Sequence, residues 1–202
     1  MTLSAVLLAG GESRRMGRDK AQVIFEGQPL WQRQIQLLRQ LEPEELFLSM
    51  RPGQTVRGGL AELAPPLPKT ELLLDEFPSR GPMSGITAAL RRMKTSHLLV
   101  LAVDMPFIVE NDLQHLVSLT RPDCGVVPRT IKGAEPLVAV YPRNALSEFT
   151  AALSSRSQSM QRLVDRLAEL KSVELIHFPP LEAERYRSVN ALEDLIARTV
   201  CR

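Results

Sequence analysis

The stretch HLLVLAVDMP at residues 97–106 is apolar at almost every position until it reaches Asp104. A half-buried strand alternates apolar and polar residues, whereas a strand that is buried on both faces is apolar throughout. The pattern therefore predicts a central strand of a parallel sheet over 97–103, covered on both faces by helices. One carboxylate, Asp104, follows directly after the end of this strand.

Similar short apolar runs alternate with segments of helical periodicity along the chain. Further strands are expected at 3–9, 46–50, 71–76, 124–128, 136–142 and 172–178. Helices are expected at 30–41, 84–93, 110–119, 144–153, 159–170 and 190–200, the last of them capped by Asn190. Loops are expected at 51–69 and 129–135. This alternation predicts an α/β fold, a three-layer sandwich with a mostly parallel, Rossmann-like central sheet.

Composition limits the class of protein. A chain of 202 residues is long enough for one sizeable core, so we expect a single domain over 1–202. The net charge of +2 does not indicate a broadly basic surface for nucleic acid. The two isolated cysteines and the absence of a recognisable targeting segment favour the cytoplasm, with no membrane association. The scattered histidines, His97, His115 and His177, are expected to be structural or surface residues rather than metal ligands.

The segment GGESRRMGRDK at 10–20 follows the first predicted strand and is rich in glycine and cations. Its spacing fits neither the Walker A loop nor the dinucleotide motif GxGxxG. The glycines Gly10 and Gly11 still allow close approach of a backbone to a ligand. The cations suit phosphate binding; they are Arg14, Arg15, Arg18 and Lys20. A phosphate site is the interpretation that we favour over a solvated turn.

Acidic residues follow two other predicted strands. Ligands of such sheets bind beyond the carboxyl ends of the strands, which is where Asp75 and Asp104 are expected. Asp104 is a hard ligand of the kind that Mg²⁺ takes, together with water and substrate phosphates. Asp75 is placed to accept hydrogen bonds from a ribose or from a base, and Gly81-Pro82 to begin a helix that packs against a flat base. Each acid also has a simpler interpretation as a turn residue.

Taken together, these segments resemble a known family. LLAGGESRRMGRDKA resembles the signature loop LxGGxSxRMGxxK of the nucleotidyltransferase superfamily, and the chain most resembles its molybdenum cofactor guanylyltransferases. The matching segments that follow in order are GQPLWQRQI, DEFPSRGPMSGI, LLVLAVDMPFI, GAEPLVAVY and RSVNALEDL. The resemblance implies a fold of the nucleotide-diphospho-sugar transferase type. It also implies an enzyme that transfers GMP from Mg-GTP to the terminal phosphate of molybdopterin and releases pyrophosphate.

The resemblance also implies roles for individual residues. GTP would be bound by the backbone at the end of the first strand and by three side chains; these residues are Leu8, Ala9, Gly10, Gly11, Lys20, Asp75 and Asp104. Asp104 would hold Mg²⁺, and Lys20, Asp104 and Arg15 would act in catalysis. Asn190 would lie on the side of the second substrate. GTP and molybdopterin are the implied partners, and other proteins of molybdenum cofactor biosynthesis are further candidates.

Two positions depart from the family pattern. Ser49 stands where the family often has a nucleotide-binding asparagine, and Ser188 replaces the first asparagine of a late Asn-Val-Asn motif. CTP or another nucleotide, with molybdopterin or another small phosphorylated acceptor, therefore remains an alternative to GTP. A non-enzymatic nucleotide-binding protein is a further alternative, which the presence of Lys20 and Asp104 disfavours.

Overall fold

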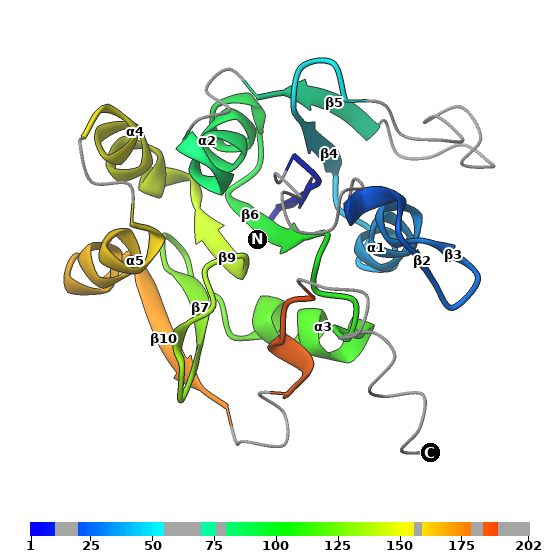
Figure 1. Cartoon of the computed structure of the whole chain (residues 1–202). Helices are drawn as coiled ribbons and strands as arrows, with labels where there is room; N and C mark the ends of the chain where they lie inside the picture. Colours follow the sequence, from blue (N-terminus) through cyan, green and yellow to red (C-terminus); the bar gives the residue numbers. More distant parts are fainter. Residues whose placement is uncertain (11–19, 55–69, 76–79, 156–158, 179–183, 190–202) are drawn as a thin grey trace.

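The computed structural model describes residues 1–10, 20–54, 70–75, 80–155, 159–178 and 184–189 (Figure 1). Its strands are β1 (Leu3–Leu8), β2 (Ile24–Phe25), β3 (Gln28–Pro29), β4 (Glu45–Met50), β5 (Thr70–Leu74), β6 (His97–Ala102), β7 (Gly125–Thr130), β8 (Gly133–Ala134), β9 (Val138–Pro142) and β10 (Val173–His177). Its α-helices are α1 (Leu30–Arg39), α2 (Pro82–Arg92), α3 (Glu110–Ser118), α4 (Leu146–Ser154) and α5 (Met160–Glu169). Short 3₁₀ turns are η1 (Lys20–Gln22), η4 (Arg143–Ala145) and η5 (Glu184–Tyr186).

The central sheet has the strand order β10-β7-β9-β6-β1-β4-β5, with β8 paired to β7. The pairs β1–β4, β1–β6, β4–β5 and β7–β10 are parallel, whereas β9 is antiparallel to both of its neighbours. The prediction of a mostly parallel sheet is thus confirmed. The sheet reverses direction at β9 because the chain turns back at once from β7 through β8, without a crossover helix between them.

Helices cover both faces of the sheet (Figure 1). Alternate residues of β1 enter two separate cores: Ala5 and Leu7 pack on the side of α1 and α3, and Val6 and Leu8 on the side of α2, α4 and α5. Every residue of β6 is buried. The interpretation of 97–103 as a central strand is therefore confirmed, because its apolar run supplies side chains to both cores.

Most predicted elements lie within two residues of their observed ends. One difference is the segment 129–135, which was expected to be a loop but contains the end of β7 and the strand β8. A second is the hairpin β2–β3, which was not predicted. Glu26 and Gly27 form its turn with φ values of 49° and 82°, the combination that two-residue hairpins favour. The expected helix at 190–200 lies outside the described residues.

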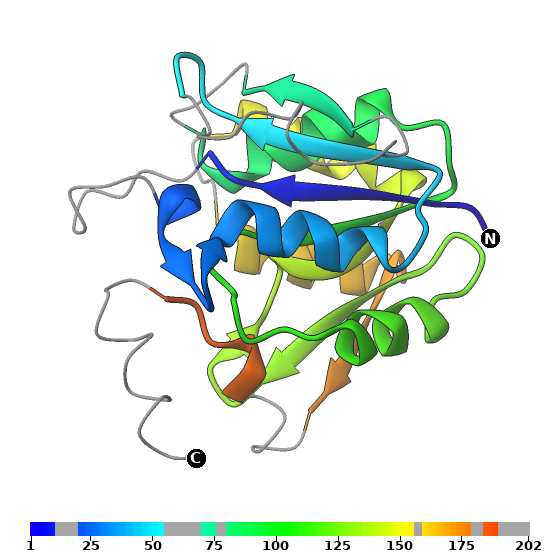
Figure 2. The same cartoon turned by 90° about the vertical axis from the view of Figure 1, so that its right-hand side faces the viewer.

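The direction of the parallel strands places their carboxyl ends at one edge, which we call the carboxyl edge. Figure 2 shows β1 and β4 running side by side toward it, with the N terminus at the opposite side of the molecule. The chain passes from β1 to β4 on one side and returns to β6 on the other. Such a change of direction opens a crevice at the end of the first strand. No helix in the described part of the chain is both long and apolar enough to span a lipid bilayer.

Candidate active site

The ends of four neighbouring strands, β6, β1, β4 and β5, build the floor of the site. Backbone hydrogen bonds continue the ladder past the strands: Val103 N–H donates to the Leu8 carbonyl at 3.0 Å, and Ala9 N–H to the Ser49 carbonyl at 2.9 Å. Asp75 N–H donates to the Met50 carbonyl at 2.8 Å. The residues that follow each strand are therefore held in line along the carboxyl edge.

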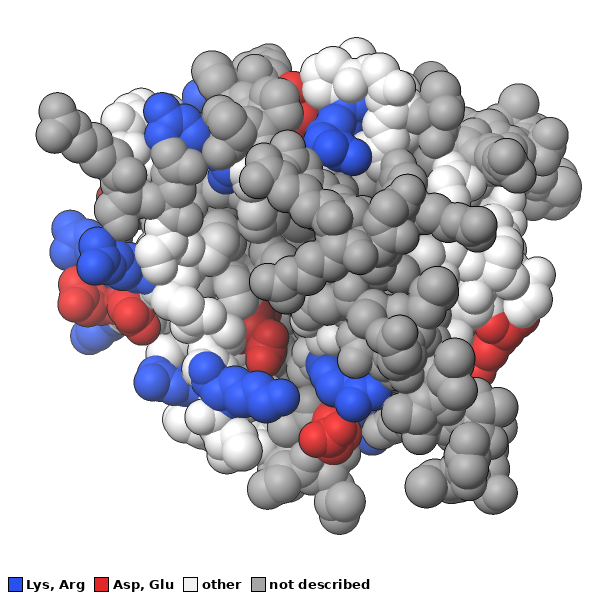
Figure 3. Space-filling model, in the orientation of Figure 1, with Lys and Arg blue, Asp and Glu red and all other residues white. Residues whose placement is uncertain are grey.

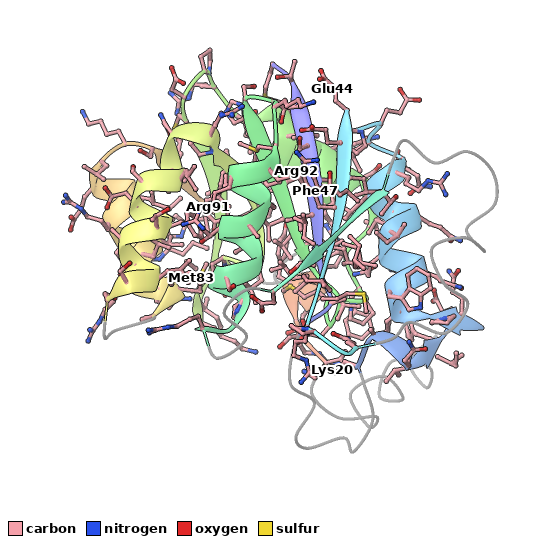
Figure 4. All side chains as sticks on the ribbon, turned by 90° about the horizontal axis from the view of Figure 1, so that it is seen from above. Lys20, Glu44, Phe47, Met83, Arg91 and Arg92 are labelled. Atoms are coloured by element: carbon pink, nitrogen blue, oxygen red, sulfur yellow. The ribbon has the colours of Figure 1, made fainter. Side chains whose placement is uncertain are left out.

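Lys20 and Asp104 meet at this edge, although 84 positions separate them in the sequence. The Lys20 Nζ atom donates to Asp104 Oδ2 at 3.1 Å, and the side chains are 16% and 23% exposed. Lys20 begins η1 directly after the glycine-rich segment, and Asp104 follows β6. Figure 4 shows Lys20 at the carboxyl edge, with Glu44 and Arg92 at the opposite edge. The structure thus brings together a cation suited to phosphate and a carboxylate suited to a metal ion.

The last described segment of the chain packs beside this pair. Val189 N–H donates to the Asp104 carbonyl at 2.7 Å. Arg185 forms an ion pair with Asp112 of α3, with Nη2 and Oδ1 2.8 Å apart, and Arg187 lies over the ring of Phe107. These contacts hold residues 185–189 beside Asp104 and the loop that follows it.

Asp75 is the buried acid of the site, with 7% of its surface exposed. Among the described residues its Oδ1 atom has no hydrogen-bond partner. A buried polar atom without a partner costs roughly 1–3 kcal/mol, so such atoms in folded proteins often serve a ligand. The side chain fits the predicted role of accepting hydrogen bonds from a nucleotide.

The backbone at the end of β1 is already engaged in part. The Gln54 side chain donates to the Ala9 carbonyl at 2.9 Å, in addition to the ladder contacts of Leu8 and Ala9. Within the described residues, no hydrogen bond involves the Gly10 backbone. Among Leu8, Ala9 and Gly10, whose backbone groups are predicted to contact the nucleotide, Gly10 therefore has the backbone groups that are most free to bind a ligand. Gly11, Arg15 and Asn190, which were also predicted as site residues, lie outside the described residues.

Helix α2 covers the ends of β1 and β4 at very close range. A Cβ atom placed on Gly85 would lie 2.4 Å from Ser49 Oγ and 3.0 Å from Leu8 Cδ2. Gly81 precedes the helix with φ of 61°, a backbone conformation that glycine tolerates, and Pro82 occupies its first turn. Ser49 is therefore buried beneath α2, and the small size of Gly85 permits this packing.

Two residues next to the site, Arg51 and Gln54, were not predicted from the sequence. Arg51 and Gln54 form the turn after β4, and the Arg51 side chain packs over Gly10, where its Cγ would lie 3.4 Å from an added Cβ. The available signal was the position of a cation immediately after a predicted strand at the ligand-binding edge. The many glycines and prolines of 51–69 hide this signal, because they indicate an irregular connection from its first residue onward.

Glu135 lies at the same edge, just before β9. Burial raises its pKa above the usual value, and this rise is opposed by a hydrogen bond from the Thr130 hydroxyl, 3.2 Å from Oε1, and by the charge of Lys132. Figure 3 looks onto this face, where described cations and acids form separate groups that lie next to one another. The described part of the face is therefore mixed in charge.

A hard divalent cation fits the chemistry of Asp104. Within the described residues, no group of three histidine, cysteine or acidic side chains forms a closed metal site. A single accessible carboxylate is nevertheless sufficient for a cation that retains water and takes its remaining ligands from substrate phosphates. Asp104 supplies such a carboxylate, and the Lys20 ammonium lies 3.1 Å from it.

Comparison with known proteins identifies relatives over most of the chain. Residues 5–171 match the family described as the MobA-like NTP transferase domain. A probable molybdenum cofactor guanylyltransferase from Opitutus terrae is 38% identical over 191 residues, which cover 93% of this chain and 89% of the relative. One from Natronomonas pharaonis is 31% identical, covering 95% of this chain and 94% of the relative.

A solved structure supports the same fold. Molybdopterin-guanine dinucleotide biosynthesis protein A from Archaeoglobus fulgidus superposes with a TM-score of 0.72 at 22% identity, covering 98% of each chain. Family membership is consistent with a requirement for a divalent metal ion. On the extent of the match and the identity to its relatives, the chain belongs to the family of MobA-like NTP transferases.

Proposed function

We propose that the protein transfers GMP from Mg-GTP to the terminal phosphate of molybdopterin and releases pyrophosphate. The names of the relatives, molybdenum cofactor guanylyltransferases, support this substrate pair. The observation that carries the proposal is the contact of Lys20 with Asp104 next to the end of β1. The contact supports the proposal because a cation suited to phosphate and a carboxylate suited to a metal ion lie together at the edge where ligands of such sheets bind.

In this reaction, an oxygen of the acceptor phosphate forms a bond to the α-phosphorus of GTP. The bond between that phosphorus and the oxygen bridging to the β-phosphate breaks, and pyrophosphate leaves with the bonding electron pair. The acceptor is a phosphate monoester with a second pKa of about 6, so it is largely ionised near neutral pH. No general base is required, and the protein's main task is to bring two anions together in line.

The residues of the site divide this task. The Lys20 ammonium has three donors, so it can retain Asp104 and also donate to phosphate oxygens. Asp104 would hold Mg²⁺, which neutralises phosphate charge and stabilises the leaving group. Arg15 and Gly11 are proposed to bind phosphates as well, and Asn190 to contact molybdopterin. Leu8, Ala9, Gly10 and Asp75 would bind the nucleoside end of GTP.

A panel of nucleotides tests the proposal. Purified protein is incubated with Mg²⁺, molybdopterin and GTP, CTP, ATP or UTP, and pyrophosphate and the dinucleotide product are measured. The proposal expects product with GTP and the loss of this product in Asp104→Asn. Preferred use of CTP would refute the choice of nucleotide, and binding of nucleotides without any pyrophosphate release would favour the non-enzymatic alternative.

A further inference from the structure

Arg51 is held firmly beside the end of β1. The Gln54 side chain bridges two segments: its Nε2 donates to the Ala9 carbonyl at 2.9 Å, and its Oε1 accepts from Arg51 N–H at 3.1 Å. Gln54 N–H also donates to the Arg51 carbonyl at 3.1 Å. The start of the Arg51 side chain lies over Gly10. The position of Arg51 is therefore determined by β1 as well as by β4.

The guanidinium of Arg51 has no partner within the described residues. Its Nε atom is buried and makes no hydrogen bond, and no ion pair involves it. Several other arginines are paired with acids, as Arg92 is with Glu71 and Arg185 with Asp112. A buried donor on a cation is costly to leave unsatisfied. A ligand that supplies an acceptor would remove this cost.

Asp75 presents the complementary group on the neighbouring strand end. Arg51 follows Met50 in the chain, and Asp75 N–H donates to the Met50 carbonyl, so both residues are direct neighbours of Met50. Yet they form no ion pair with each other, and the buried Asp75 Oδ1 is also unpartnered among the described residues. The two unpartnered groups, one donor and one acceptor, thus belong to residues at neighbouring strand ends.

The sheet order indicates which part of a nucleotide would reach them. Asp104 follows β6, on one side of β1, whereas Arg51 and Asp75 follow β4 and β5, on the other. With strands about 4.8 Å apart, three strand spacings of roughly 14 Å separate Asp104 from Asp75. A nucleotide whose phosphates lie at Lys20 and Asp104 thus extends across β1 and directs its base toward Arg51 and Asp75.

We propose that Arg51 selects the base, donating to the O6 and N7 atoms of guanine while Asp75 accepts from its N1–H and 2-amino group. This inference rests on the proposed function, since it places phosphates at Lys20. Arginine has only donors, so it matches the two acceptors of guanine. Adenine and cytosine each present an amino donor where guanine has O6. A site that hydrogen-bonds one group rejects an analogue that lacks it.

The test measures binding of GTP, ATP and CTP in the presence of Mg²⁺ by calorimetry, without molybdopterin. Arg51→Met keeps an unbranched side chain over Gly10 but removes all donors. It should weaken GTP binding by about 10- to 100-fold and leave the weaker binding of ATP and CTP nearly unchanged. Arg143→Met is the matched control, because Arg143 is exposed and follows β9 at the opposite edge. It should change no affinity.

Other outcomes overturn the proposal. An equal loss for all three nucleotides, restored by Arg51→Lys, would assign Arg51 to a phosphate, and unchanged GTP binding would leave it a packing role only. Melting temperatures close to the wild-type value show that each variant is folded. Because binding is measured without the acceptor, its outcome is separate from the proposed function. A protein that selects GTP through Arg51 but forms no product with molybdopterin would refute the proposed transfer reaction and leave the role of Arg51 intact.

Discussion

Replacing Gly85 by alanine should push helix α2 away from the carboxyl edge. The added Cβ would lie 2.4 Å from Ser49 Oγ, 3.2 Å from Ser49 Cβ and 3.0 Å from Leu8 Cδ2. Leu8 Cδ2 is the end of a flexible side chain and can move, whereas Ser49 is 3% exposed and belongs to β4. The contact with Ser49 is therefore the one that strains the packing.

Two opposing contributions determine the size of the effect. Alanine is favoured over glycine inside a helix by about 1 kcal/mol. Forcing an extra carbon into a well-packed core costs about 1–3 kcal/mol, and a contact as short as 2.4 Å indicates the upper part of that range. We expect a net loss of about 1–2 kcal/mol in the free energy of unfolding. With a urea slope of about 2–3 kcal/mol/M, the midpoint should fall by about 0.5 M.

Urea unfolding followed by fluorescence measures this loss, since the protein has one tryptophan, Trp31, which is fully buried. The decisive comparison is a double-mutant cycle with Ser49→Ala, which removes the oxygen nearest the new carbon. In the Ser49→Ala background, Gly85→Ala should lower the free energy of unfolding by less than about half of its effect in the wild type, because only the looser contacts remain. An equal loss in both backgrounds, or none in the wild type, would refute the reasoning.

Three further predictions concern the ion pair and a buried histidine. Asp104→Asn should lower the turnover rate at least about 100-fold, measured as pyrophosphate release, and change the urea midpoint little; normal turnover would refute its metal role. Lys20→Met should reduce kcat/KM for GTP about 100-fold, and unchanged kinetics would exclude a phosphate contact. Burial lowers the pKa of His97, whose Nε2 donates to the Arg121 carbonyl at 3.1 Å. The folded state thus favours the neutral ring. The contribution of His97 to the free energy of unfolding is fully present above the unfolded pKa of about 6.5, and it is lost as the pH falls toward the lower pKa of the folded state. Urea midpoints from pH 8 to 5 should therefore fall less steeply in His97→Gln, and parallel profiles would contradict this.

The local sequence was sufficient to predict the long strands of the central sheet and which candidate site residues follow them. An apolar run such as 97–103 has no polar face to turn toward water, so it must lie inside a sheet. Once the strands are taken as parallel, their ends share one edge, and Lys20, Asp75 and Asp104 were placed there from chain order alone. The structure brings all three to that edge.

What the sequence could not determine depends on contacts between distant segments. The antiparallel direction of β9 follows from its pairing with β6 and β7, which periodicity within a strand does not report. Likewise, Arg51 looked like one cation in an irregular connection. Only the packing of the turn against β1, through Gln54 and Gly10, places it in the site.

The sequence by itself therefore determined the class of fold, the family and which candidate residues follow the ends of the strands, because the apolar pattern and the order of residues can be read from the chain alone. Only the tertiary structure decided how close those groups come, which ones stay unpartnered and which glycine allows the helix to approach. The physical reason is that hydrogen-bond satisfaction and close packing belong to pairs of residues. Such pairs, like Gly85 with Ser49 or Lys20 with Asp104, exist only once the chain has folded.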